Sequence, residues 1–144
     1  MCGPAGHIPC VTSEQSRAEV HVELPPDLTA ARAARAATRH ALPRWRLGNL
    51  LEPVLLVVSE LVGNAVRHGK PPVDLRLRKT GSGVRVDVHD EASSPPQRPA
   101  TAHDGESGRG MLLVDAVAAE SGVEQIEGDG KVVWARVDPE PDGR

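Results

Sequence analysis

The stretch "PVLLVVSELVGNAVRHG" (residues 53–69) sets a carboxylate and an amide, Glu60 and Asn64, into a largely apolar segment that ends with Arg67 and His68 before Gly69. Its apolar residues recur at helical spacing, which predicts a helix over 53–68 that Gly69 ends as a left-handed terminator. Residues four apart lie on one helix face, so Glu60 and Asn64 project together. Burying such groups without partners is costly, so this face needs a chemical reason.

Two interpretations of this polar face remain open. It can be the solvated side of an amphipathic helix, which is the simpler interpretation. Its narrowness favours the other: a carboxylate and an amide on adjacent turns form an oxygen pair suited to Mg²⁺ and to activation of a hydroxyl. His68, one turn further on, either supports that site through a ring nitrogen or serves only the helix end.

Composition excludes several functional classes. The chain has 144 residues, the length of one domain, with no Phe or Tyr, only two Trp and a net charge of −3. Aromatic stacking platforms and basic surfaces are the usual means of binding nucleic acid, so direct nucleic-acid binding is not expected. Both cysteines lie within the first ten residues, which leaves no disulfide framework or zinc signature in the body. We find neither a signal-peptide pattern nor an uninterrupted apolar run of about 18 residues, and expect a cytoplasmic protein with no membrane association.

The chain divides into a flexible N-terminal tail (1–18), a domain (19–138) and a C-terminal tail (139–144). Strands in the domain come as neighbouring hairpins, which predicts an α/β two-layer sandwich: a mixed, mostly antiparallel sheet covered on one face by about three helices. The predicted elements are a strand over 20–24, a helix from Asp27 to Pro43, a helix over 53–68, a hairpin of strands 73–78 and 84–90, a helix over 108–120 that Ser121 and Gly122 end, and a hairpin over 123–137. The Pro/Ser/Gly-rich segment 91–107 is typical of a functional lid.

Two further patterns carry possible chemistry. Asp90 closes a predicted strand where the long segment opens, either as a turn residue or as an acceptor for an exocyclic amine such as that of adenine. In "SGRGM", Gly108 and Gly110 let the backbone approach a phosphate at a helix start, and Arg109 adds donors. Glycines that merely begin a helix explain the same letters, and a Walker sequence is absent.

Taken together, residues 53–137 resemble the ATP-binding domain shared by gyrase-type topoisomerases, histidine kinases and mismatch-repair ATPases, known as the Bergerat or GHKL fold. More closely, they resemble the small anti-sigma-factor serine/threonine kinases abundant in actinobacteria. The matching motifs are "SELVGNAVRHG" (59–69) as the N box, "VRVDVHDEASSPP" (84–96) and "GRGMLLVDAVA" (108–118) as the two glycine boxes, and "GKVVWARV" (130–137) as the closing strand.

The resemblance implies a role for each matching residue. Glu60 corresponds to the general base that activates the partner's hydroxyl, Asn64 to the Mg²⁺ ligand and Asp90 to the adenine anchor. The implied nucleotide contacts are Asn64, His68, Asp90, Ala92, Gly108, Arg109, Gly110 and Met111.

The resemblance also implies an activity and partners. Such a protein uses ATP and Mg²⁺ to phosphorylate a Ser or Thr of an anti-sigma-factor antagonist, sequesters a sigma factor, and forms a homodimer. Arg32, Arg35 and Arg39 lie on one stripe of the first predicted helix, which is a solvated face or a surface for these protein partners.

The sequence departs from the family pattern at three places. The usual D-x-G-x-G reads Asp90 to Ser94 as "DEASS", without either glycine, and the usual Thr of the closing strand is replaced by Val132. The second glycine box is also short of glycine beyond Gly110. These changes keep open a second interpretation, an anti-sigma binding module with a weak or inactive nucleotide site. A third, a catalytic fragment of a histidine kinase, is disfavoured because no dimerisation helix pair precedes residue 20.

Overall fold

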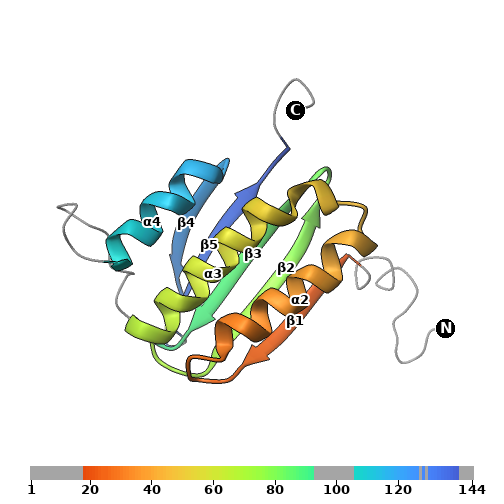
Figure 1. The fold of residues 1–144 in the computed structure, drawn as a ribbon. Coiled ribbons are helices and arrows are strands. Elements are labelled where there is room, and N and C mark those ends of the chain that lie inside the picture. Colours follow the sequence, from red (N-terminus) through yellow and green to blue (C-terminus); the bar gives the residue numbers. More distant parts are fainter. Residues whose placement is uncertain (1–17, 93–105, 127, 129, 140–144) are drawn as a thin grey trace.

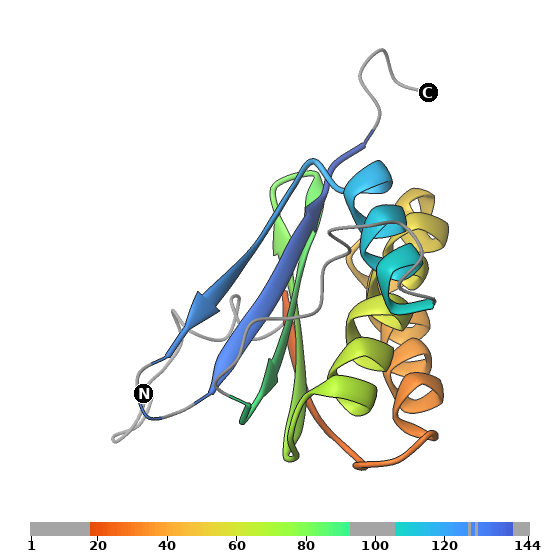
Figure 2. The same ribbon diagram turned by 90° about the vertical axis from the view of Figure 1, so that its left-hand side faces the viewer.

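The computed structural model describes residues 18–92, 106–126, 128 and 130–139. Nearly all of the predicted N-terminal tail and most of the 91–107 segment and of the C-terminal tail lie outside these residues. The described part forms two layers, a β-sheet and a set of helices that covers one of its faces (Figure 1, Figure 2). This arrangement confirms the predicted two-layer α/β fold.

The sheet is antiparallel at each of its strand pairs. Its five strands lie in the order β1-β2-β3-β5-β4. The strand bounds are β1 Glu19–Leu24, β2 Val73–Thr80, β3 Gly83–Asp90, β4 Glu120–Gln125 and β5 Lys131–Val137. Two hairpins, β2-β3 and β4-β5, account for most of the order, as their alternating sequences predict.

Alternation along the strands assigns each side chain to one face of the sheet. On β3, Val84, Val86 and Val88 are fully buried beneath the helices, and Asp90 continues the same series. On β5 the buried series is Val133, Ala135 and Val137, and it begins with Lys131. Asp90 and Lys131 therefore both lie on the helix-covered face.

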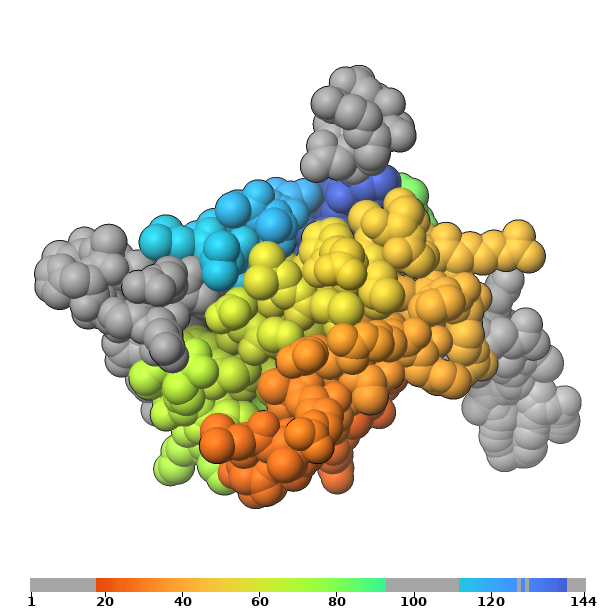
Figure 3. All heavy atoms as spheres, in the orientation of Figure 1, coloured from red at the N-terminus to blue at the C-terminus, as the bar shows by residue number. Residues whose placement is uncertain are grey.

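Helix α3 (Leu51–His68) is the central helix and packs against the sheet, α2 (Ala30–Arg44) and α4 (Glu106–Val117). Figure 3 shows these helices side by side across the helical face. The Gly48–His68 segment is long and apolar enough to span a membrane by length and composition alone. In this fold its apolar residues form the core, so the pattern is weak evidence for a span. The core residues of α3 are Val54, Val57, Val58, Leu61, Val62 and Ala65.

Four predicted element ends are corrected by the structure. Helix α2 runs one residue past Pro43, although proline lacks the N–H that would donate to the carbonyl four residues earlier. Helix α3 begins at Leu51, ahead of Pro53, after a 3₁₀ turn over Gly48–Leu50. Ser121 and Gly122 belong to β4 rather than ending α4. At Gly122 the neighbouring Trp134 ring leaves a side chain almost no room, since a Cβ would lie 3.0 Å from its Nε1.

The fourth correction is Gly69, whose φ of −94° and ψ of −162° are extended rather than left-handed. Its lack of a side chain serves packing instead. A Cβ at this position would lie 2.6 Å from Asp90 Cγ and 2.7 Å from the Ala65 carbonyl oxygen. Gly69 thus lets the end of β3 approach the end of α3.

Candidate functional site

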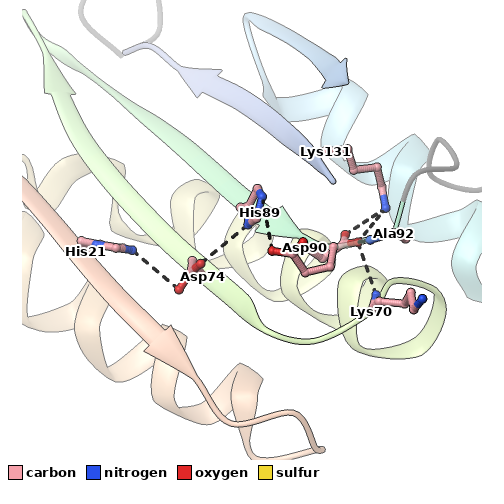
Figure 4. A network of polar contacts seen from close by, with 8 residues as sticks. His21, Lys70, Asp74, His89, Asp90, Ala92 and Lys131 are labelled. Carbon is pink, nitrogen blue, oxygen red and sulfur yellow. Dashed lines mark hydrogen bonds and ion pairs between the residues drawn. The ribbon is translucent and has the colours of Figure 1, made fainter. Parts of the chain in front are cut away.

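The Asp90 carboxylate is the centre of a buried polar cluster at the end of β3. Asp90 is 1% exposed and faces Lys131 directly across the β3-β5 pair. The Lys131 ammonium donates to both carboxylate oxygens, at 3.0 Å from Nζ to Oδ1 and 2.9 Å to Oδ2 (Figure 4). Both buried charges are satisfied by this geometry, because each lies within hydrogen-bond distance of its partner.

Backbone groups complete the cluster. The amide N–H groups of Lys70 and Ala92 both donate to Asp90 Oδ1, with N···O distances of 3.3 and 2.8 Å. The chain segments that follow α3 and β3 are therefore tied to the same carboxylate. Ala92, a predicted nucleotide contact, belongs to this cluster through its backbone N–H.

Asn64, on α3, supplies a second polar group beside this cluster. It is 6% exposed, and its buried amide oxygen has no hydrogen-bond partner among the described residues. A buried acceptor without a partner is costly unless a ligand meets it. An amide oxygen is a normal ligand for Mg²⁺, so this residue fits the metal that the resemblance implies.

Asn64 and Asp90 share the wall of one small cavity of about 10 Å³. This volume is room for about one water molecule. His68, predicted as a site residue, also lines it and is itself exposed on the outer side. The remaining lining residues are Leu61, Ala65, Gly69, Lys131 and Val133.

Glu60 is placed one helical turn before Asn64 and is half-buried. Among the described residues that line the cavity, Glu60 is not included. The structure thus brings Asn64, His68 and Asp90 together and leaves Glu60 beside them, on the next turn of the same helix.

Gly108 and Gly110, the glycines of the second box, lie within the first two turns of α4. The helix begins at Glu106, two residues before the predicted start at Gly108. The helix begins on the side of the molecule on which α3 and β3 end (Figure 1). The first backbone N–H groups of a helix have no intrahelical acceptor and favour anions. The side chains of Arg109 and Met111 lie outside the described part of the structure.

The opposite face of the sheet carries a separate polar groove of about 380 Å³. In it Asp74 lies between two histidines, with 3.7 Å from Oδ1 to His21 Nε2 and 3.6 Å from Oδ2 to His89 Nδ1 (Figure 4). Within the described ranges, no group of three or more His, Cys, Asp or Glu side chains is arranged to hold a metal ion. The predicted surface residues Arg32, Arg35 and Arg39 are exposed on α2.

Comparison with protein families decides what this arrangement belongs to. Residues 24–137 match the model of the histidine kinase-like ATPase domain, which spans both layers and the whole cluster around Asp90. The chain belongs to this family. A histidine kinase-like ATPase domain binds ATP, so the cavity between Asn64 and Asp90 is the candidate nucleotide site.

A solved structure shares this fold. The crystal structure of the RsbU and RsbW domains of Rv1364c from Mycobacterium tuberculosis matches with a TM-score of 0.63 and 20% identity, covering 83% of this chain and 31% of that one. The histidine kinase domain from the blue-light activated histidine kinase of Erythrobacter litoralis EL346 matches with a TM-score of 0.46 and 26% identity, covering 60% of this chain and 43% of that one. This chain thus spans less than half the length of either. Comparison with curated proteins gives no match.

One residue of this histidine kinase-like ATPase site was missed by the sequence analysis, which sought the altered position of the closing strand at Val132. Val132 lies on the other face of the sheet, where it lines the open groove. The side chain that meets Asp90 is Lys131. The period of two set by Val133, Ala135 and Val137 already assigns Lys131 to the inner face, and this signal is available in the sequence.

Proposed function

We propose that this histidine kinase-like ATPase domain is a cytoplasmic, ATP-dependent serine/threonine kinase of the partner-switching kind. It phosphorylates a Ser or Thr of an anti-sigma-factor antagonist and sequesters a sigma factor, acting as a homodimer. The observation that carries the proposal is the unpartnered buried oxygen of Asn64, one turn after the half-buried Glu60 and across a cavity from Asp90. Family membership and the shared fold support it.

Each residue has a distinct task in this proposal. Asn64 Oδ1 holds Mg²⁺, which when bound neutralises phosphate charge. Glu60 accepts the proton of the acceptor hydroxyl as its oxygen bonds to the γ-phosphorus and the bridging P–O bond to ADP breaks. Asp90 accepts a hydrogen bond from the adenine amine. Phosphoryl transfer depends mainly on positioning and charge neutralisation, so few protein groups suffice.

Replacing Glu60 and Asn64 separates these tasks. Glu60→Gln keeps the side-chain shape and removes the base, so ATP affinity should stay within a few-fold of the parent. Transfer should fall by roughly 10²–10⁴, the usual contribution of a positioned base. Asn64→Ala should lose Mg²⁺-dependent ATP binding and transfer together.

The measurement is transfer of radiolabelled phosphate from ATP to an unphosphorylated antagonist protein. Glu52→Gln is the matched control, because Glu52 is exposed in the first turn of the same helix. It should leave the rate unchanged. A Glu60→Gln protein that transfers phosphate at the parental rate contradicts the role of Glu60 as base.

Two observations favour a second candidate function. Asp90 is already paired with Lys131, and the cavity beside it has room for only about one water molecule. These features fit an anti-sigma binding module whose nucleotide site is weak or inactive. Such a module would capture the sigma factor equally with and without MgATP. Replacing Arg32, Arg35 and Arg39 by Ala would test whether this stripe of α2 is the surface that binds the partner.

A further inference from the structure

The Asp90 carboxylate has few acceptor positions left for a ligand. Its Oδ1 accepts from the Lys70 N–H, the Ala92 N–H and the Lys131 ammonium, and its Oδ2 accepts from the same ammonium. A carboxylate offers about four lone-pair positions in total. A base amine that seeks Asp90 must therefore share or replace the contacts that Lys131 makes.

The space beside Asp90 is taken by the same side chain. Only 4% of the Lys131 side chain is exposed, and the cavity that it lines with Asn64 and Asp90 measures about 10 Å³. A purine ring needs far more room than one water position. The long lysine side chain is the flexible element of this wall, whereas Asp90 is fixed by two backbone donors and by the contact with Gly69.

We propose that Lys131 is an internal competitor for the base position and sets the affinity of the site for purine nucleotides. In the nucleotide-free protein its ammonium occupies Asp90. A base enters when the Lys131 side chain leaves the carboxylate and moves into solvent. The inference rests on the proposed nucleotide site and adds the residue that controls access to it. The apparent affinity is lower than the intrinsic one by the fraction of molecules in which Lys131 is displaced.

Lys131→Thr tests this competition. Threonine removes the charge and most of the length of the side chain that contacts Asp90. We expect the variant to bind MgATP at least about tenfold more tightly than the parent in a calorimetric titration. A gain of this size follows if Lys131 leaves Asp90 in no more than about a tenth of the parent molecules. Lys131→Met, which keeps the length and removes the charge, should show an intermediate gain.

Lys79→Thr is the matched control. Lys79 has an exposed side chain on β2 and is not among the described residues that line the cavity, so the change removes one positive charge and leaves the ion pair intact. Its ATP affinity should equal that of the parent. Equal affinity in the parent and Lys131→Thr would overturn the role of Lys131 and leave the proposed function standing. Absence of ATP binding in both would overturn the two together.

Lysine labelling of the parent chain tests the same claim without a variant. The chain has three lysines, and Lys70 and Lys79 are exposed references. An amine-acylating reagent followed by peptide mass spectrometry should modify Lys131 far more slowly than either reference when nucleotide is absent. Saturating MgATP should raise the Lys131 rate several-fold and leave the Lys79 rate unchanged. Continued protection of Lys131 with ATP bound would overturn the proposal.

Discussion

At the scale of single residues, the site depends on the close approach of the end of α3 to the end of β3. Gly69, directly after α3, leaves space that the Asp90 carboxylate fills, and the next residue donates its backbone N–H to that carboxylate. A side chain at 69 would meet both Asp90 and the carbonyl oxygen of Ala65. The absence of a side chain at Gly69 therefore allows Asp90 to take this position.

Gly69→Ala should destabilise the fold by roughly 1–3 kcal/mol, the usual effect of overpacking a tight site. The backbone neighbour cannot move away cheaply, because the Ala65 carbonyl lies within the helix. Gly48→Ala is the control, since a Cβ there would meet nothing within 4 Å. Denaturant unfolding of both proteins measures the difference. Equal stability of the two variants would contradict the packing role of Gly69.

The sequence was informative about some residues of the site and silent about their contacts. Four-residue spacing placed Glu60 and Asn64 on one helix, and the N-box resemblance marked them for chemistry. The partner of Asp90 was not found, because cross-strand pairing joins residues 90 and 131, which are 41 positions apart. Alternation shows that Lys131 faces inward, and only the β3-β5 register shows which residue it faces.

At the scale of elements, the start of α2 is held by Asp27. Its Oδ1 accepts from the Thr29 N–H at 2.8 Å and from the Thr29 hydroxyl, and these hydrogen bonds lower the pKa of Asp27 below its ordinary value of 3.8. The sequence placed the cap near Asp27. In the structure Thr29 is the N-cap residue, and its own side chain makes no cap hydrogen bond.

The lowered pKa of Asp27 makes this contribution pH-dependent. A carboxylate with a lower pKa in the folded state stabilises the fold above its unfolded pKa, and the effect is lost as pH falls through the folded pKa. Asp27→Ala should melt at a lower temperature than the parent near neutral pH, and the two melting curves should converge in acid. Asp27→Asn keeps an oxygen acceptor and should retain most of the stability. A constant difference across a pH series would contradict the assignment.

Element types were predictable from periodicity, and element ends were not. Pro43 was expected to end its helix, and Ser121-Gly122 to end another. Both expectations used local propensity. Helix α2 continues one residue past the exposed Pro43, and Gly122 lies in β4 against Trp134, where tertiary contacts override propensity.

At the scale of the whole molecule, one face of a five-stranded antiparallel sheet carries the helices, and the site lies where α3 and β3 end. The hairpin order predicted this architecture, because antiparallel neighbours need only short turns. The size of the candidate nucleotide cavity depends on side-chain packing across several elements, which no local pattern contains.

The most direct test of the account is a calorimetric titration of the full chain with ATP in the presence and absence of Mg²⁺, with Asn64→Ala measured beside it. We predict saturable one-to-one binding by the parent that requires Mg²⁺ and is lost in Asn64→Ala. The variant should keep its melting temperature, because the amide oxygen it removes has no hydrogen-bond partner among the described residues that would be left unpaired. A parent that gives no binding heat with MgATP, or an Asn64→Ala protein that binds it equally well, would contradict the central claim.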